Sequence, residues 1–284
     1  MSNGLLDIMV RSKNAMEAYE ASLRIHTNNG ANLATSGYKA MTHSFKTIFN
    51  EVLHNGYTDP SGSGGGINPV QFGSGVTIAN IKLDFSQGDL GEGGSLDMAV
   101  AGRGLFVITS NTTEDGNYLY TRNGEFRVDS TGQYIVDSSG RKLLGYEVGG
   151  GGALAPIRTQ GYKDLGWKDG GILVDNYQAE KDGTGVAVPI AQVALADFVN
   201  VEGLVQHDGT AFEESVSSGA PSNFGISGDG TLGEVMAQQL EKSNVFFIGE
   251  TIDSIEVQRA MSAVLTAIKT ASDQISQVIN RLSG

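Results

Sequence analysis

Few residues in this chain of 284 have the types and the spacing that catalysis or metal binding requires. Cysteine is absent, which excludes disulfides, thiolate metal sites and thiol nucleophiles. No serine stands in the Gly-x-Ser-x-Gly pattern of a hydrolase, and no acidic loop has the spacing of an EF-hand. The four histidines are too far apart in the sequence to suggest a zinc pair: His26, His43, His54 and His207. The sequence therefore predicts that the protein is not an enzyme and that it holds no metal and no cofactor.

Two glycine-rich segments, residues 62–66 and residues 102–104, come nearest to a phosphate-binding loop. Neither ends in the Lys-Ser/Thr pair of a P-loop, and neither joins a strand to a helix as a dinucleotide-binding loop does. Carboxylates are plentiful, but without a predicted cleft no pair of them can be assigned as acid and base. We interpret the glycine segments as ordinary turns and the carboxylates as solvated surface.

Net charge and hydropathy limit the partners of the chain. The formal net charge of −13 at pH 7 argues against duplex nucleic acid or an anionic membrane as the main partner. The longest apolar run, residues 186–199, is interrupted by Gln192 and Asp197 and is shorter than the roughly 18 residues that cross a bilayer. Asp7 divides the apolar run near the N-terminus. We therefore expect no nucleic-acid partner, no membrane insertion and no cleaved signal peptide.

Glycine and proline divide the chain into three parts. Residues 51–233 hold 35 of the 40 glycines and all five prolines, whereas residues 1–50 hold three glycines and residues 234–284 hold two. Because both residue types disfavour helices, the ends are predicted to be helical and the middle to be rich in strands. The predicted fold class is α+β and discontinuous. We expect a helical domain from 1–50 and 234–284, a Gly/Ser-rich linker at 51–75 and a β-rich domain at 76–233.

Both ends carry apolar stripes with heptad spacing. The C-terminal stripe alternates at spacings of four and three, as the seam of a coiled coil does: Val257, Met261, Val264, Ile268, Ala271, Ile275, Val278 and Leu282. A weaker stripe of the same spacing lies near the N-terminus: Leu5, Met9, Ser12, Met16, Tyr19, Leu23 and His26. One such stripe alone is more typical of a helix packed on its own domain. Two of them, at opposite ends of one chain, favour pairing of the terminal helices with each other.

Strands are predicted through the middle of the chain. Short apolar or alternating runs bounded by turn residues occur at 76–85, 96–100, 105–109, 118–122, 125–129, 133–137 and 142–148. Asn123 and Gly124 separate two of these runs and give the strongest hairpin signal, because both tolerate positive φ. Residues 59–66 and 149–152 resemble linkers or loop tips. Beyond residue 152 only 172–174 and 186–200 resemble strands, and the order of the strands is not predicted.

Several segments resemble the bacterial flagellar rod and hook protein family. Residues 28–39, NNGANLATSGYK, resemble the N-N-x-A-N-x-x-T-x-G-[FY]-K signature that closes the first helix of these proteins. Residues 240–259, LEKSNVFFIGETIDSIEVQR, resemble the family's L-E-x-S-N-V followed by Q-R. FSQGDL, LDMAVAGRGLFV and YTRNGEFRVDSTG, which begin at residues 85, 96 and 120, resemble its shared β-domain. Three positions depart from the pattern: Gly30 replaces a leucine, Ala34 replaces a frequent asparagine, and Phe246 stands where an acidic helix cap is common.

The resemblance implies that the matched residues of the two terminal motifs act in assembly: Asn28, Asn29, Ala31, Asn32, Thr35, Gly37, Tyr38, Lys39, Ser243, Asn244, Val245, Gln258 and Arg259. It also implies that the terminal helices form an inner coiled-coil domain lining a central channel, with the β-domain outside. Gly37 is expected to take the left-handed conformation that ends a helix. Asn32 and Thr35 are expected to bond the backbone groups that this helix end leaves free.

By this resemblance the chain is expected to be a structural subunit of the flagellar axis. Such a subunit assembles with copies of itself into a helical homo-oligomer and contacts neighbouring rod and hook proteins. It leaves the cytoplasm through the flagellar type III export apparatus without signal cleavage and resides in the basal body or hook.

Three functions remain to be compared. A rod subunit of the basal body, which transmits torque and is most like the distal rod, is favoured over a short hook protein. The reason is that residues 149–233 are too few for the additional outer domain of most hook proteins. A secreted β-rich adhesin or glycan-binding protein is the remote alternative, and it is disfavoured because the middle of the chain has one tryptophan, Trp167.

Overall fold

The computed structural model describes residues 2–56, 68–110, 118–148, 152–177 and 187–282. An N-terminal helix and a C-terminal helix flank a β-rich middle. The chain divides into two compact units. Unit 1 contains Met1–Ala31, Met41–Lys82 and Phe246–Gly284, and unit 2 contains Asn32–Ala40 and Leu83–Val245. Each unit is therefore built from segments that are far apart in the sequence.

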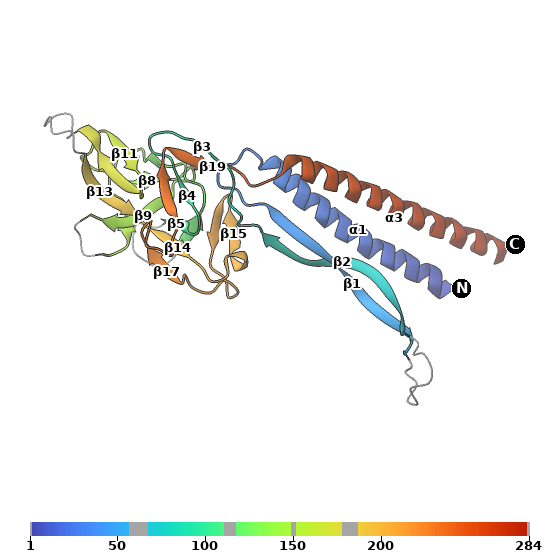
Figure 1. Ribbon diagram of the computed structural model, residues 1–284. Helices are drawn as coiled ribbons and strands as arrows, with labels where there is room; N and C mark the ends of the chain where they lie inside the picture. The colour runs from blue at the N-terminus through green and yellow to red at the C-terminus, as the bar shows by residue number, and fades with distance from the viewer. Residues whose placement is uncertain (1, 57–67, 111–117, 149–151, 178–186, 283–284) are drawn as a thin grey trace, which may run out of the picture. The chain divides into compact units, whose positions relative to one another are not determined.

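Unit 1 consists of two long helices and a two-stranded sheet. Helix α1, Ser2–Ala31, and helix α3, Phe247–Leu282, lie side by side and contact each other (Figure 1). Strand β1, Met41–His54, pairs with strand β2, Val70–Leu83, and also contacts α1. Among the residues that the structure describes, no helix is long and apolar enough to cross a membrane.

The predicted C-terminal stripe is the least exposed face of α3. Ala271 is buried at 4% exposure, and five other members of the stripe are half-buried between exposed neighbours: Val257, Met261, Val264, Ile268 and Ile275. The burial ends near the C-terminus, where Val278 is 51% exposed. The side chain of Leu282 lies outside the described residues. The heptad spacing thus identifies the face of α3 that packs within unit 1.

On α1 the buried face differs from the predicted stripe. The described members of that stripe are half-buried, and the fully buried residues follow an adjacent line along the helix: Ala18, Ser22, Ile25 and Asn29. Helix α1 contacts both α3 and β1, so its most enclosed face includes small and polar residues. A search for large apolar side chains does not detect such a face.

Two segments that were expected in the helical domain are strands. Residues 41–50 form most of β1, and residues 234–241 contain β18, Glu234–Ala237, and β19, Gln239–Glu241. Over much of β1, aromatic and β-branched residues alternate with polar ones, a pattern typical of a strand. The low glycine count of this segment led to the prediction of a helix instead. The expected linker at 51–75 includes the end of β1 and the start of β2. Its Gly/Ser-rich part at 59–66 lies outside the described residues.

The described part of unit 2 is built around one 13-stranded sheet. Its strands are β5 (Leu105–Thr109), β6 (Leu119–Thr121), β7 (Arg127–Val128), β8 (Ile135–Val136), β9 (Lys142–Glu147), β10 (Ala155–Pro156), β11 (Leu165–Lys168), β12 (Ile172–Asp175), β13 (Val188–Val193), β14 (Leu195–Asp197), β15 (Val205–Asp208), β16 (Ala211–Glu213) and β17 (Asn223–Gly225). The main path runs β11-β12-β13-β9-β5-β6-β16-β15. A short 3-10 helix, Val201–Gly203, precedes β15.

Two smaller antiparallel pairs join distant parts of the chain in unit 2. Strand β18 pairs with β4, Met98–Ala101, and β19 pairs with β3, Leu90–Glu92. Strands β10 to β17 extend the sheet of β5 to β9, since β13 pairs with β9 and β14 pairs with β5. The described strands of residues 155–225 therefore belong to the same sheet as β5 to β9. The order of these strands was not predicted from the sequence.

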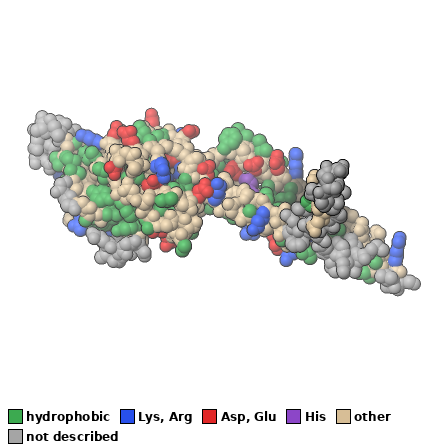
Figure 2. Space-filling view, turned by 60° about the horizontal axis from the view of Figure 1, so that its bottom comes forward, with side chains coloured by type: hydrophobic (Ala, Val, Ile, Leu, Met, Phe, Trp, Pro, Cys, Tyr) green, Lys and Arg blue, Asp and Glu red, His purple; other side chains and the backbone are tan. Residues whose placement is uncertain are grey.

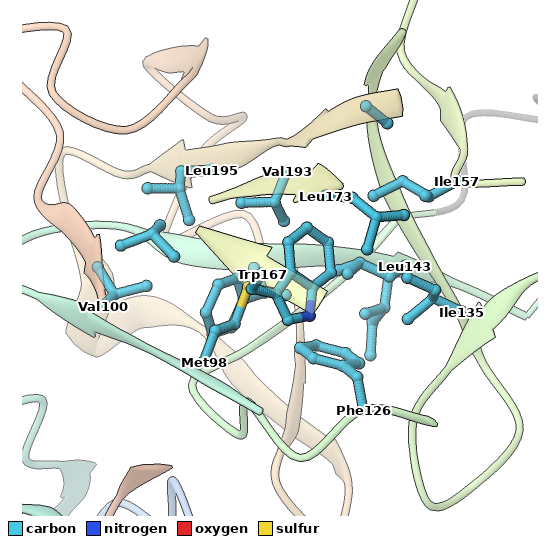
Figure 3. Close-up of a cluster of buried hydrophobic side chains, with 14 of the residues drawn as sticks. Met98, Val100, Phe126, Ile135, Leu143, Ile157, Trp167, Leu173, Val193 and Leu195 are labelled. Carbon is cyan, nitrogen blue, oxygen red and sulfur yellow. The ribbon is translucent and has the colours of Figure 1, made fainter. Parts of the chain in front are cut away.

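The hydrophobic core of unit 2 packs between these strands (Figure 3). Trp167 lies among Met98, Phe126 and Leu173 and is 5% exposed. Its indole N–H donates a hydrogen bond of 2.9 Å to the carbonyl oxygen of Leu96, which satisfies the polar atom of a buried aromatic side chain. The only tryptophan is thus a core residue.

Gly124 is required by close packing. A Cβ at this position would lie 1.5 Å from the carbonyl oxygen of Met98, whose own N–H donates to the Gly124 carbonyl at 3.1 Å. Neither Asn123 nor Gly124 has positive φ. The turn signal therefore marks a break between β6 and β7, but the predicted hairpin and the positive φ predicted for it are both wrong. Strand β6 pairs with β5 and β16, whereas β7 pairs with β8.

We expect Gly124→Ala to lower the free energy of unfolding of unit 2 by about 3 kcal/mol, because the new methyl group must displace backbone atoms. The measurement is chemical unfolding followed by the fluorescence of Trp167. Gly94→Ala is the matched control, since its Cβ would have the Asp97 carboxylate as nearest neighbour at 3.3 Å, and it should change stability by less than about 1 kcal/mol. Equal effects of the two substitutions would contradict this explanation.

Candidate assembly site

The loop after α1 is held by a left-handed glycine. Gly37 has a φ of 67°, as predicted, and its N–H donates to the carbonyl oxygen of Glu241 at 2.7 Å. A Cβ here would lie 2.3 Å from the backbone nitrogen of Asn123. Helix α1 ends six residues earlier, at Ala31, so Gly37 does not cap it. The glycine instead lets the loop approach two other segments of unit 2.

A buried carboxylate joins the two terminal motifs. Glu241 Oε1 lies 2.6 Å from Lys39 Nζ, and Glu241 Oε2 lies 3.2 Å from Arg122 Nη1. The backbone N–H of Gly88 also donates to Glu241 Oε1, at 2.9 Å. The side chains of Lys39 and Glu241 are fully buried, and that of Arg122 is 7% exposed. We call Lys39, Arg122 and Glu241 the Glu241 cluster.

Two cations share one carboxylate in this cluster, which raises the cost of burying them. Burial lowers the pKa of Lys39, and the charge of Glu241 opposes that change. Burial also lowers the pKa of Arg122 against the same opposition. Backbone carbonyls supply the remaining acceptors, because Lys39 donates to Ser86 O at 2.8 Å and Arg122 donates to Gly102 O at 2.6 Å. Charges buried in this way are stable only as a complete set.

Asn244 crosslinks three segments of unit 2. Its Oδ1 accepts a hydrogen bond of 2.8 Å from the Ala40 N–H, and its Nδ2 donates to Asp84 O at 2.7 Å. Tyr38, Ala40 and Val245 form a small buried apolar cluster. Sequence motifs about 200 residues apart thus meet within one unit.

A second polar cluster lies in unit 1. Asn29 Nδ2 donates to Glu250 Oε1 at 2.8 Å and to Met41 O at 2.9 Å, and Asn29 Oδ1 accepts from the Met41 N–H at 2.9 Å. His26 Nδ1 lies 2.5 Å from Glu250 Oε2. The Asn29 side chain therefore connects α1, β1 and α3.

The other predicted site residues contribute less to these clusters. Asn28 is exposed and reaches Met41 Sδ at 3.8 Å, and Thr35 bonds Asn32 locally at 3.2 Å. Ser243 Oγ accepts from the Val245 N–H at 3.4 Å. Ala31, Gln258 and Arg259 are exposed to solvent.

Sequence reasoning missed the charged partners of both clusters. Glu241 and Arg122 lie inside the quoted motifs but were not singled out as site residues, and neither was Glu250 of the second polar cluster. A charged residue within a predicted strand was a usable signal for Arg122, because a strand of the core must bury half of its side chains. The pairing of Lys39 with Glu241 has no local signal, since 201 residues separate them.

The described residues show no alternative chemical site. No group of three or more histidine, aspartate or glutamate residues among them could hold a metal ion. On the face seen in Figure 2, acidic and basic side chains are interspersed. One of the larger surface hollows, about 510 Å³, lies along α1 beside Glu20, Leu23 and Arg24, and it is shallow.

The sequence of the chain is similar to those of flagellar rod and hook proteins. A family model described as the flagellar hook protein FlgE/F/G D1 domain matches residues 99–192. The flagellar basal-body rod protein FlgG of Buchnera aphidicola subsp. Schizaphis graminum is 29% identical over 274 residues, covering 95% of this chain and 97% of the relative. FlgG of Bacillus subtilis is 29% identical over 267 residues, covering 93% and 95%.

A hook protein is similar over a smaller part. FlgE of Helicobacter mustelae is 33% identical over 116 residues, which are 38% of this chain and 26% of the hook protein. The similarity to FlgG proteins, by contrast, extends over nearly the whole length of both chains. The chain is thus similar to the distal rod protein FlgG over nearly its full length, and residues 99–192 match the domain model that hook and rod proteins share.

Proposed function

We propose that this chain is a structural subunit of the flagellar rod, of the distal rod type, which assembles with copies of itself into a helix around a central export channel. The observation that carries the proposal is the full-length similarity to FlgG proteins. The two terminal helices that flank a β-rich middle support it, because this is the organisation that the resemblance to rod and hook proteins implies.

The architecture of unit 2 favours a rod subunit over a short hook protein. The described strands between residues 155 and 225 extend the sheet of β5 to β9, so they do not supply an additional outer domain. A secreted adhesin or glycan-binding protein is less well supported, because Trp167 is buried in the core.

We propose that α1 and α3 pair as a coiled coil that is completed by neighbouring subunits. Most described residues of the α3 stripe are only half-buried, and Leu265, Val278 and Ile279 are 46%, 51% and 57% exposed. Long helices with partly exposed apolar faces are marginal in isolation. Contacts between subunits would supply the missing burial.

The two motifs have different proposed roles. Lys39, Asn244 and Asn29 find their partners within their own units, so they shape the subunit that assembles. Gln258 and Arg259 are exposed on α3 and are proposed to contact neighbouring subunits. The proposed partners are further copies of the chain, adjacent rod and hook proteins and the type III export apparatus, at a location outside the cytoplasm that is reached without signal cleavage.

In the dilute monomer, we expect α1 and α3 of unit 1 to order only on assembly, whereas residues 32–40 and 240–245 stay folded as parts of unit 2. Hydrogen exchange should be fast in α1 and α3 and slow in the sheet of unit 2, and proteolysis should leave a core that contains residues 83–245. If exchange in α3 were as slow as in β5 and β9, ordering on assembly would be ruled out.

Deletion of residues 261–284 should abolish polymerisation, as measured by sedimentation and electron microscopy, and should leave the Trp167 unfolding transition unchanged. Ala267→Ser, at an exposed position of α3, is the control and should polymerise as the parent chain does. Polymers formed by the truncated chain would contradict the proposed role of α3.

Glu241→Gln should lower the free energy of unfolding of unit 2 by about 3–5 kcal/mol, because it leaves Lys39 and Arg122 buried without a counter-charge. Glu213→Gln is the matched control, since Glu213 also ends a strand of unit 2 but its side chain is 58% exposed. The control should change stability by less than about 1 kcal/mol. Denaturant unfolding followed by Trp167 fluorescence measures both, and a small effect of Glu241→Gln would contradict the structural role of the cluster.

A further inference from the structure

Unit 1 contains a stack of four rings contributed by α1 and β1. Tyr19 of α1 meets Phe45 of β1 with ring centroids 5.8 Å apart. Phe45 meets His43 at 5.1 Å, and His43 meets His26 of α1 at 5.2 Å. Each pair is close to edge-to-face, a geometry that stabilises aromatic contacts. The two histidine rings therefore lie at one end of a stack that joins α1 to β1.

Polar partners fix both histidines in place. His43 Nε2 lies 2.8 Å from Ser22 Oγ, and Ser22 is fully buried on α1. His26 Nδ1 lies 2.5 Å from Glu250 Oε2 of α3, and the side chains of His26 and Glu250 are 11% and 18% exposed. Among the described residues, the hydrogen-bond partner of His43 is the Ser22 hydroxyl and not a carboxylate.

The surroundings of His43 oppose its protonation on balance. Burial is the main cause that lowers the pKa of His43, and His26 lowers it further. Glu250 and Asp253 of α3 act in the opposite direction but do not reverse the change. A proton on His43 would thus occupy a partly desolvated site beside a second imidazole ring.

We propose that His43, which packs against His26 and Phe45 and bonds Ser22, makes unit 1 acid-sensitive, so that protonation of His43 loosens the packing of β1 and α3 on α1. The inference concerns the stability of unit 1 in the assembled chain and rests on the proposed function for that assembly. It assigns a role to two of the four histidines that assembly leaves unexplained.

The direction of the effect follows from proton linkage. A histidine whose pKa is lower in the folded chain takes up a proton on unfolding. The stability of unit 1 should therefore be complete at neutral pH, fall as the pH drops below the ordinary histidine value of 6.5, and stop falling below the folded pKa of His43. For one group, the folding equilibrium constant can fall by at most about tenfold per pH unit.

The test compares thermal unfolding of the full chain at about pH 7.5 and about pH 5.5, on either side of the histidine range. Far-ultraviolet circular dichroism reports α1 and α3, and Trp167 fluorescence reports unit 2 in the same sample. We expect acid to lower the helical midpoint more than the Trp167 midpoint. His43→Gln, which keeps a hydrogen-bonding group for Ser22, should remove this difference.

Two further variants separate the cluster from a general effect of acid. His207→Gln removes an exposed histidine of unit 2 and should retain the full acid response. His26→Gln should weaken the response without abolishing it, because burial remains the main cause. Because α1 and α3 are expected to order only on assembly, the test uses assembled chains and follows the sedimenting fraction beside the helical signal. A parent chain that does not sediment at neutral pH would contradict the proposed function and not this inference. An acid response of equal size in the parent chain and in His43→Gln would overturn the proposal, as would the absence of any response in the parent chain.

Discussion

The buried carboxylate of Glu241 is the interaction on which unit 2 depends most. It lies near the C-terminal end of the unit and binds Lys39 near its start and Arg122 in its middle. Removing charges from water is costly, and this cost is offset only when every charge and every hydrogen-bonding atom finds a partner. The chain meets most of that condition: the Gly88 N–H donates to the carboxylate, and the carbonyl oxygens of Ser86 and Gly102 accept from Lys39 and Arg122. Nε of Arg122 is buried without a hydrogen-bond partner.

The structure separates internal contacts from exposed side chains. Lys39, Asn244 and Asn29 of the terminal motifs bond inside their own units, whereas Gln258 and Arg259 are exposed on α3. Unit 2 has its own hydrophobic core. Under the proposed function, unit 2 would supply stability and the exposed side chains of α3 would contact further copies of the chain.

Much of the fold follows from local sequence patterns. Glycine and proline content located the β-rich middle, heptad spacing found the packed face of α3, and turn residues marked the strands from β4 to β9. The patterns failed where the structure depends on distant partners. Residues 41–50 are a strand because β2 and α1 complete them, and Gly124 is a glycine because Met98 approaches it. Lys39 and Asn244 were found through motifs, but their partners Glu241 and Asp84 are set by the fold.

A double-mutant cycle between Lys39→Met and Glu241→Gln tests the role of the buried carboxylate most directly. The free energies of unfolding of the parent chain, both single variants and the double variant would be measured by Trp167 fluorescence in denaturant. If Glu241 holds the start and the end of unit 2 together through Lys39, the two substitutions should be coupled by at least about 1 kcal/mol. Effects that add to within about 0.5 kcal/mol would contradict the account.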